Sequence, residues 1–130
     1  MAFNLQIDAS NPRRSTLHLE GRLDALTFGD FDKEAEKVLQ HMETGSTLVL
    51  DLSSLEYISS AGLRSIAKAR KHMRARDGHT LLLNPQVQVR KVFDIVKAVP
   101  IKEIFQNVQE LDDYLDQIQR KMLGESEEME

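Results

Sequence analysis

The chain has 130 residues, no cysteine and a formal net charge of −4, with 41% hydrophobic and 29% charged residues. This composition is typical of a single globular domain with its own core. The lack of cysteine excludes disulfides, thiolate catalysis and cysteine metal sites. The acidic balance argues against a general nucleic-acid binder, and no apolar run approaches the roughly 20 residues of a membrane helix. Since Met1 opens no signal-peptide pattern, we expect a cytoplasmic protein without direct membrane insertion.

The first elements are two strands and a helix. The alternation that is typical of half-buried strands involves Phe3, Leu5, Ile7, Leu17 and Leu19. Asn11-Pro12 supplies turn residues between them, which predicts a hairpin. Thr27 and Asp30 have the spacing of a capping box and predict a helix over residues 28–42. Its apolar side is Phe28, Phe31, Ala35, Leu39 and Met42.

The middle of the chain predicts a buried strand, a short loop and a second helix. Residues 48–52 are an apolar run suited to a strand that is covered on both faces. Ser59 and Ser60 follow a loop and stand at the mouth of the helix. The helix should bury Leu63, Ile66, Ala67 and Met73. It should end near Asp77-Gly78.

The last third predicts another buried strand over residues 80–83 and two helices. The first of these helices carries Val89, Val92, Phe93 and Val96, and it ends before Pro100. A brief strand or loop is expected around residues 103–105. The final helix begins at an Asn107 cap answered by Glu110. Its inner face is Val108, Leu111, Leu115, Ile118 and Met122.

The resulting element order is β-β-α-β-α-β-α-(β)-α. Strands that alternate with helices favour parallel pairing, and the opening hairpin adds an antiparallel pair. We therefore predict one α/β domain over residues 1–123, with a four- or five-stranded mixed sheet and about four helices. Residues 124–130 form an acidic tail that we expect to be disordered.

The chain lacks the patterns of an enzyme. Its four histidines are scattered, so no metal-ligand spacing arises, and it has no GxSxG, Walker or GxGxxG motif. Asp24 and Asp51 could meet near the strand ends, but no base or metal accompanies them. No histidine near Ser60 would activate it as a nucleophile. We predict no enzymatic activity, cofactor or metal.

Ser60 has two physical interpretations. A serine at a helix start can simply cap the helix, or it can accept a phosphate, which the unpaired N–H groups and the helix dipole favour there. Arg64, Lys68 and Lys71 continue from Ser60 at helical spacing and predict one exposed basic stripe. The stripe is either a solvated face or a docking strip for an acidic groove on a partner.

Two separated motifs resemble one family. Residues 48–63, which end in Ser59-Ser60-Ala61-Gly62-Leu63, and Gly21-Arg22-Leu23-Asp24 resemble the STAS domain. More narrowly, they resemble the bacterial anti-sigma factor antagonists, and the similarity extends from about residue 3 to about residue 115.

The resemblance implies a phosphorylation switch. In that family the serine two positions before the motif glycine is phosphorylated by a serine-kinase anti-sigma factor, and a PP2C-type phosphatase reverses the modification. That serine is Ser60 here. The unphosphorylated form would bind and sequester the kinase, and phosphorylation would block binding. The implied partner surface is Asp24, Ser59, Ser60, Gly62, Arg64, Lys68 and Lys71.

The motif departs from the family pattern at two positions. Ser59 stands where aspartate is frequent and is the less favoured second acceptor, and Ala61 stands where serine is frequent. We expect a monomer when the protein is free of partners. The alternatives are a STAS subunit of a lipid-transport or stress-signalling complex that is never phosphorylated, or a small enzyme or nucleotide-binding domain.

Overall fold

A computed structural model describes residues 3–98 and 107–123. Its sheet has four strands in the order β1-β2-β3-β4. The strands are β1 (Phe3–Asn11), β2 (Arg14–Leu23), β3 (Thr47–Ile58) and β4 (His79–Leu83). The helices are α1 (Phe28–Gln40), α2 (Ser60–Ala75), α3 (Val87–Ala98) and α5 (Val108–Met122). This is the predicted α/β class and element order, except that residues 103–105 lie outside the described residues.

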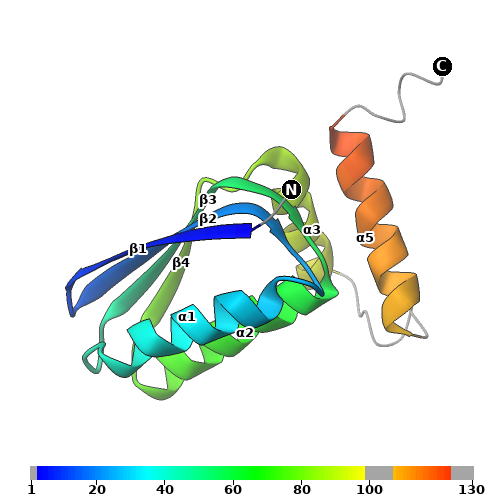
Figure 1. The fold of residues 1–130 in the computed structure, drawn as a ribbon. Helices are drawn as coiled ribbons and strands as arrows, with labels where there is room; N and C mark the ends of the chain where they lie inside the picture. Colours follow the sequence, from blue (N-terminus) through cyan, green and yellow to red (C-terminus); the bar gives the residue numbers. More distant parts are fainter. Residues whose placement is uncertain (1–2, 99–106, 124–130) are drawn as a thin grey trace.

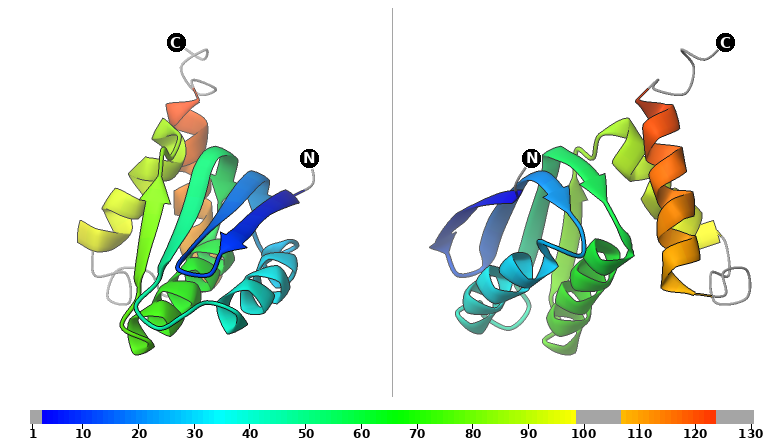
Figure 2. Two further views of the ribbon diagram at one scale, coloured as in Figure 1. Left: turned by 90° about the vertical axis from the view of Figure 1, so that its left-hand side faces the viewer. Right: turned by 45° about the vertical axis from the view of Figure 1, so that its right-hand side comes forward.

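The sheet is mixed because a hairpin connects its first pair of strands and helical crossovers connect its other pairs. β1 pairs antiparallel with β2, whereas β2, β3 and β4 pair in parallel. Asn11 stabilises the hairpin turn by accepting the Arg13 N–H at 2.9 Å. α1 and α2 lie together beneath one face of the sheet (Figure 1). α3 and α5 pack on each other at one end of it (Figure 2).

The core lies between the sheet and the α1–α2 layer. Its largest fully buried side chains are Phe31, Leu17, Leu19, Leu23, Leu48, Leu50, Leu52, Leu55, Ile58, Ile66, Met73 and Leu115. The opposite face of β2 presents polar residues such as His18 and Glu20 to solvent. No described helix is both long and apolar enough to cross a bilayer.

Strand β3 is longer than predicted. The expected loop after residue 52 continues as strand to Ile58, and Leu55 and Ile58 are fully buried. Its pairing with β2 shifts register twice, so that β3 carries extra residues between the paired positions. Such bulges break the two-residue alternation by which a strand is recognised in sequence.

Other predictions needed correction on burial. Strand β4 is not buried on both faces, since Leu81 is 53% exposed and Leu83 is 42% exposed. Ala67 is exposed on α2 instead of packed against the core. Phe28, predicted on the inner side of α1, is 40% exposed. The pattern of apolar residues therefore predicted burial better in β2 than in β4, α1 and α2.

The two predicted helix caps differ in outcome. Asn107 caps α5, because its side chain accepts the Glu110 N–H at 2.8 Å. Thr27 occupies the N-cap position of α1 but makes no side-chain cap bond, so the predicted capping box is wrong. Its hydroxyl instead donates to the Arg22 carbonyl at 2.8 Å and accepts the Asp24 N–H at 2.9 Å. Thr27 thus stabilises the loop that precedes the helix.

Candidate functional site

The two sequence motifs meet where β2 and β3 end. The Ser59 N–H donates to the Leu23 carbonyl at 3.0 Å, and Leu23 pairs with Ile58 in the sheet. Parallel strands end at the same edge of a sheet, and α2 begins there at Ser60. The loop after Leu23 and the serine pair after Ile58 therefore form one site.

Gly62 permits this close approach. A Cβ atom at position 62 would lie 2.5 Å from the Leu23 carbonyl oxygen and 2.8 Å from Ile58 Cγ1. Both distances are far below van der Waals contact, and the first neighbour is backbone that cannot rotate away. The glycine of the motif therefore lets the first turn of α2 pack against the end of β2.

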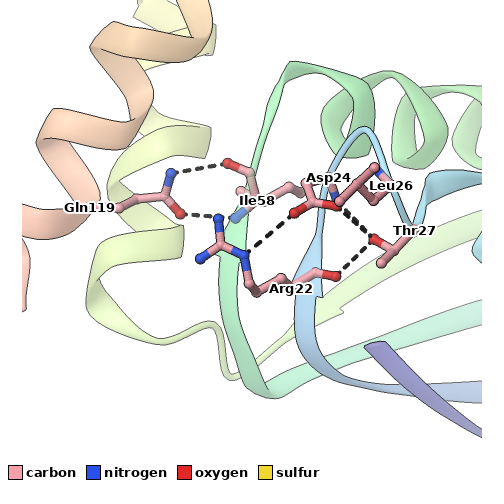
Figure 3. A network of polar contacts seen from close by, with 6 residues as sticks. All are labelled: Arg22, Asp24, Leu26, Thr27, Ile58 and Gln119. Carbon is pink, nitrogen blue, oxygen red and sulfur yellow. Dashed lines mark hydrogen bonds and ion pairs between the residues drawn. The ribbon is translucent and has the colours of Figure 1, made fainter. Parts of the chain in front are cut away.

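Asp24 organises the loop that faces the serines. Its carboxylate accepts the Leu26 N–H at 3.0 Å, and the Thr27 hydroxyl oxygen lies 3.2 Å from the same carboxylate. The Arg22 Nε lies 3.4 Å from the same carboxylate (Figure 3). These contacts fix a short loop whose Leu26 side chain is 91% exposed. The loop therefore presents an apolar tip beside the site.

The serines are buried, which sequence reasoning did not anticipate. Ser59 is 5% exposed and Ser60 is 3% exposed, and neither hydroxyl has a hydrogen-bond partner among the described residues. Ser59 is the N-cap residue of α2 and Ser60 is its first helical residue, yet neither side chain caps the helix. The capping role considered for Ser60 is therefore absent, and both hydroxyls are left unsatisfied.

Helix α5 packs against the start of α2 and the end of β3. The Asp112 carboxylate accepts the Ser60 N–H at 2.9 Å, so a negative charge already sits at the start of α2. Gln119 Oε1 accepts the Ile58 N–H at 2.9 Å, and Gln119 Nε2 donates to the Ile58 carbonyl at 3.0 Å (Figure 3). The Gln119 side chain thus pairs with the end of β3 as another strand would.

Tyr57 connects the Asp24 loop with α5. The Arg22 guanidinium stacks 3.8 Å from the centre of the Tyr57 ring. Burial of the ring, followed by the negative charge of Asp116 on α5, raises the pKa of the Tyr57 hydroxyl to about 12. Asp112 acts in the same direction, and Arg22 partly opposes both carboxylates. One continuous set of contacts therefore runs from the loop to α5.

Sequence alone gave no signal for these α5 contacts. Asp112 and Gln119 lie on a helix rich in acidic and amide side chains, and only the packing of α5 distinguishes them from their exposed neighbours Asp113 and Gln117. The partner of Asp51 was missed in the same way. Asp51 lies on the open face of β3, 2.7 Å from His18 Nδ1, whereas Asp24 contacts Arg22, so the carboxylate pair considered from the sequence does not form. No cluster of potential metal ligands occurs among the described residues.

The basic stripe is only partly as predicted. Arg64, Lys68 and Lys71 are exposed along α2, but Ser60 is buried at its beginning and does not share the stripe. Lys68 Nζ lies 3.8 Å from the Asp32 carboxylate on α1. A hollow of about 300 Å³ is lined by Ser60, Arg64, Arg70 and apolar residues of α2, α3 and α5. Arg64 is therefore the cation of the stripe nearest to the serines.

Comparisons with known proteins found similar chains. The provisionally named anti-sigma factor antagonist BtrV of Bordetella bronchiseptica is 42% identical over 62 residues, which is 48% of this chain and 53% of BtrV. The chain thus spans about half the length of this curated relative.

Two solved structures have a similar fold. The unphosphorylated anti-sigma factor antagonist SpoIIAA superposes with a TM-score of 0.59 at 22% identity, covering 70% of this chain and 82% of that one. A Thermotoga maritima protein, provisionally named as another such antagonist, gives 0.61 at 20% identity, covering 82% and 94%. The STAS domain family model matches residues 6–111, and the chain therefore belongs to the STAS domain family.

Proposed function

We propose that this protein is an anti-sigma factor antagonist of a partner-switching pathway, controlled by phosphorylation of Ser60. The observation that carries the proposal is the position of Ser60 as the first residue of α2, two residues before a glycine that packs on the Asp24 loop. BtrV and SpoIIAA bear the name of anti-sigma factor antagonists, and SpoIIAA has been solved in both an unphosphorylated and a phosphorylated form.

The proposed partner is an anti-sigma factor that is itself a serine kinase. It transfers the γ-phosphoryl group of ATP to the Ser60 Oγ, the hydroxyl proton is lost, and ADP leaves. A PP2C-type phosphatase hydrolyses the phosphoserine and restores the hydroxyl. The unphosphorylated form binds the kinase, and Ser59 is the secondary acceptor.

The switch acts through charge at the interface. Phosphate adds nearly two negative charges and three acceptor oxygens. A partner that packs over this spot must desolvate them, which costs about 2–5 kcal/mol when the charge stays unpaired. That corresponds to roughly thirtyfold to several thousandfold in affinity. The binding choice can therefore reverse while the fold of the domain stays the same.

The test is phosphorylation by each candidate kinase with ATP, followed by mass spectrometry. We expect a mass gain of one phosphate that Ser60→Ala abolishes and Ser59→Ala preserves. Ser60→Asp should weaken binding to the kinase by at least about thirtyfold. Tight binding of Ser60→Asp would contradict the switch, and phosphate found only on Ser59 would move it to that residue.

The burial of both serines favours a second candidate. A serine with 3% exposure is also what a non-phosphorylated STAS subunit of a lipid-transport or stress-signalling complex would have. Affinity purification of the full chain distinguishes the two functions. Recovery of a histidine-kinase-like ATPase supports the antagonist, and recovery of membrane transport subunits without such a kinase supports the alternative.

A further inference from the structure

The buried position of Ser60 conflicts with its role as a kinase substrate, and α5 explains the conflict. A kinase must bring ATP to the Ser60 Oγ, yet Ser60 is 3% exposed and its N–H is bonded to Asp112. We propose that α5 is a gate: docked, it closes the serine pair to kinase and partner, and it must undock before Ser60 is modified. This inference rests on the proposed role of Ser60.

The gate is held by polar contacts at the edge of the sheet. Gln119 makes two hydrogen bonds to Ile58, at 2.9 and 3.0 Å, and is itself 1% exposed. Asp112 adds its bond to the Ser60 N–H, where the positive end of the α2 dipole strengthens the attraction. These are specific, geometry-dependent contacts, so loss of any one of them weakens docking.

The apolar contribution of α5 to the core is small. Of the apolar α5 side chains that the structure describes, only Leu115 is fully buried, and Leu111 and Ile118 are half-buried. Most members of the core cluster come from the sheet, α1 and α2, and α5 adds Leu115, with Leu111 packed against the cluster. A helix with few buried apolar contacts belongs to the low-stability end of a structure, where local opening occurs without global unfolding.

Phosphate and Asp112 compete for the same place. The Asp112 carboxylate occupies the N–H of the residue that would carry the phosphate, and Asp116 lies near by against Tyr57. A phosphate on Ser60 would meet the Asp112 carboxylate if α5 returned to its docked position. Like charges in a partly buried site repel strongly. Phosphorylation therefore holds the gate open, and dephosphorylation lets it close.

The absence of native cysteine makes the gate directly measurable. In the full chain, Ser60→Cys places one thiol at the site, and its reaction with Ellman's reagent reports access to that position. We expect labelling at least about a hundredfold slower than for a thiol at the exposed Ser53 (Ser53→Cys). Equal rates at the two positions would overturn the proposal, because the site would already be open.

Weakening the contacts of α5 should open the site. Gln119→Ala and, independently, Asp112→Ala should each speed labelling of Ser60→Cys by about tenfold or more. The matched controls are Gln117→Ala and Asp113→Ala, which remove the same side chains from exposed positions of α5 and should change nothing. No acceleration by either test variant would show that α5 is not the barrier.

A second thiol separates gate opening from unfolding. Ser65→Cys lies on α2, 3% exposed, in the groove between α1 and α2 and away from α5. In the Gln119→Ala and Asp112→Ala backgrounds this thiol should stay protected. Equal acceleration at positions 60 and 65 would show that α5 opens only together with the whole fold, and the gate would be rejected.

The effect of phosphate is tested without any kinase. Phosphoserine incorporated at position 60 during translation should abolish hydrogen-exchange protection of the α5 amides while α2 and β3 stay protected. Full protection of α5 in that protein would overturn the competition with Asp112. Since neither readout uses a partner, a working gate in a chain that no kinase modifies would reject the proposed function alone.

Discussion

Gly62 fixes the distance between the two segments that form the site. Its missing side chain leaves room for the Leu23 carbonyl, which also accepts the Ser59 N–H. Because the role of Gly62 comes from its lack of a side chain, arguments from charge or hydrophobicity do not identify it, although the glycine could be placed in its motif from the sequence. The structure adds the physical reason, which is backbone-to-backbone approach and not a left-handed φ.

Gly62→Ala should destabilise the protein by about 1–3 kcal/mol, because the added methyl overlaps backbone that has no space to move. The control is Gly29→Ala in α1, where an added Cβ meets nothing within 4 Å. This second change should stabilise the helix by about 0.5–1 kcal/mol. Urea denaturation of both variants measures the difference, and equal midpoints would contradict the steric argument.

The Ser59 hydroxyl stands at the N-cap position of α2 but makes no hydrogen bond, so its contribution to the free energy of unfolding can be predicted in two ways. Loss of a functioning N-cap serine costs about 1 kcal/mol. The buried Ser59 hydroxyl makes no hydrogen bond, so its removal also relieves an unsatisfied polar group. We expect Ser59→Ala to be neutral or stabilising in urea denaturation. A loss near 1 kcal/mol would show that the hydroxyl caps α2 in solution.

At the scale of elements, helices were easier to predict than the strand that carries the site. The spacing of Leu111, Leu115 and Ile118 predicts α5, and Asn107 caps it as the sequence predicts. Strand β3 was cut short at residue 52 because its bulges interrupt the alternation. The docking of α5 onto β3 could not be predicted from the sequence. Gln119 forms hydrogen bonds with backbone atoms of Ile58, and every residue has such atoms, so the side chain at position 58 does not indicate the contact.

The ionisation of Tyr57 provides an element-scale prediction about the docked helix. The pKa of its hydroxyl is raised to about 12, so the folded form holds the phenol proton more tightly than the unfolded chain, where tyrosine ionises near pH 10. The resulting stability is complete below about pH 10 and is lost as pH rises toward 12. In a Tyr114→Phe background, which leaves one tyrosine, ultraviolet titration should give a midpoint near 12.

Asp116→Asn should then lower that midpoint, because the carboxylate that disfavours the phenolate is removed. The exposed Asp113→Asn on the same helix is the control and should leave the midpoint in place. Titration of Tyr57 near pH 10 with Asp116 intact would mean that α5 does not cover the ring in solution.

At the scale of the whole molecule, the sequence predicted the α/β class, the element order and the place of Ser60 at the start of α2. It did not predict that the site is closed. The reason is physical: the periodicity of each helix reports which side is apolar, but not which other element covers it. The two motifs are close in the predicted topology because parallel strands share an edge, whereas no such rule places α5 at that edge.

The net charge of −4 conceals a local basic surface that gives a prediction about partner binding. Arg64 and Lys71 are exposed on α2 and form no ion pair in the described part of the chain, whereas Lys68 lies 3.8 Å from Asp32. Exposed charges that lack an internal partner contribute little to folding. They are free to meet an acidic groove on a partner, where charge complementarity raises the association rate.

Arg64→Glu should therefore weaken binding of the proposed kinase partner by more than about tenfold while leaving the urea midpoint unchanged. Arg90→Glu is the matched control, because Arg90 is an exposed arginine of α3 and lies outside the Arg64–Lys68–Lys71 stripe of α2. Both variants change the net charge equally, so a general electrostatic effect would weaken both.

Surface plasmon resonance at low and high salt distinguishes the two cases. A docking strip predicts a loss of affinity that is specific to position 64 and that diminishes as salt screens the contact. Unchanged affinity of Arg64→Glu would leave the stripe as a solvated face.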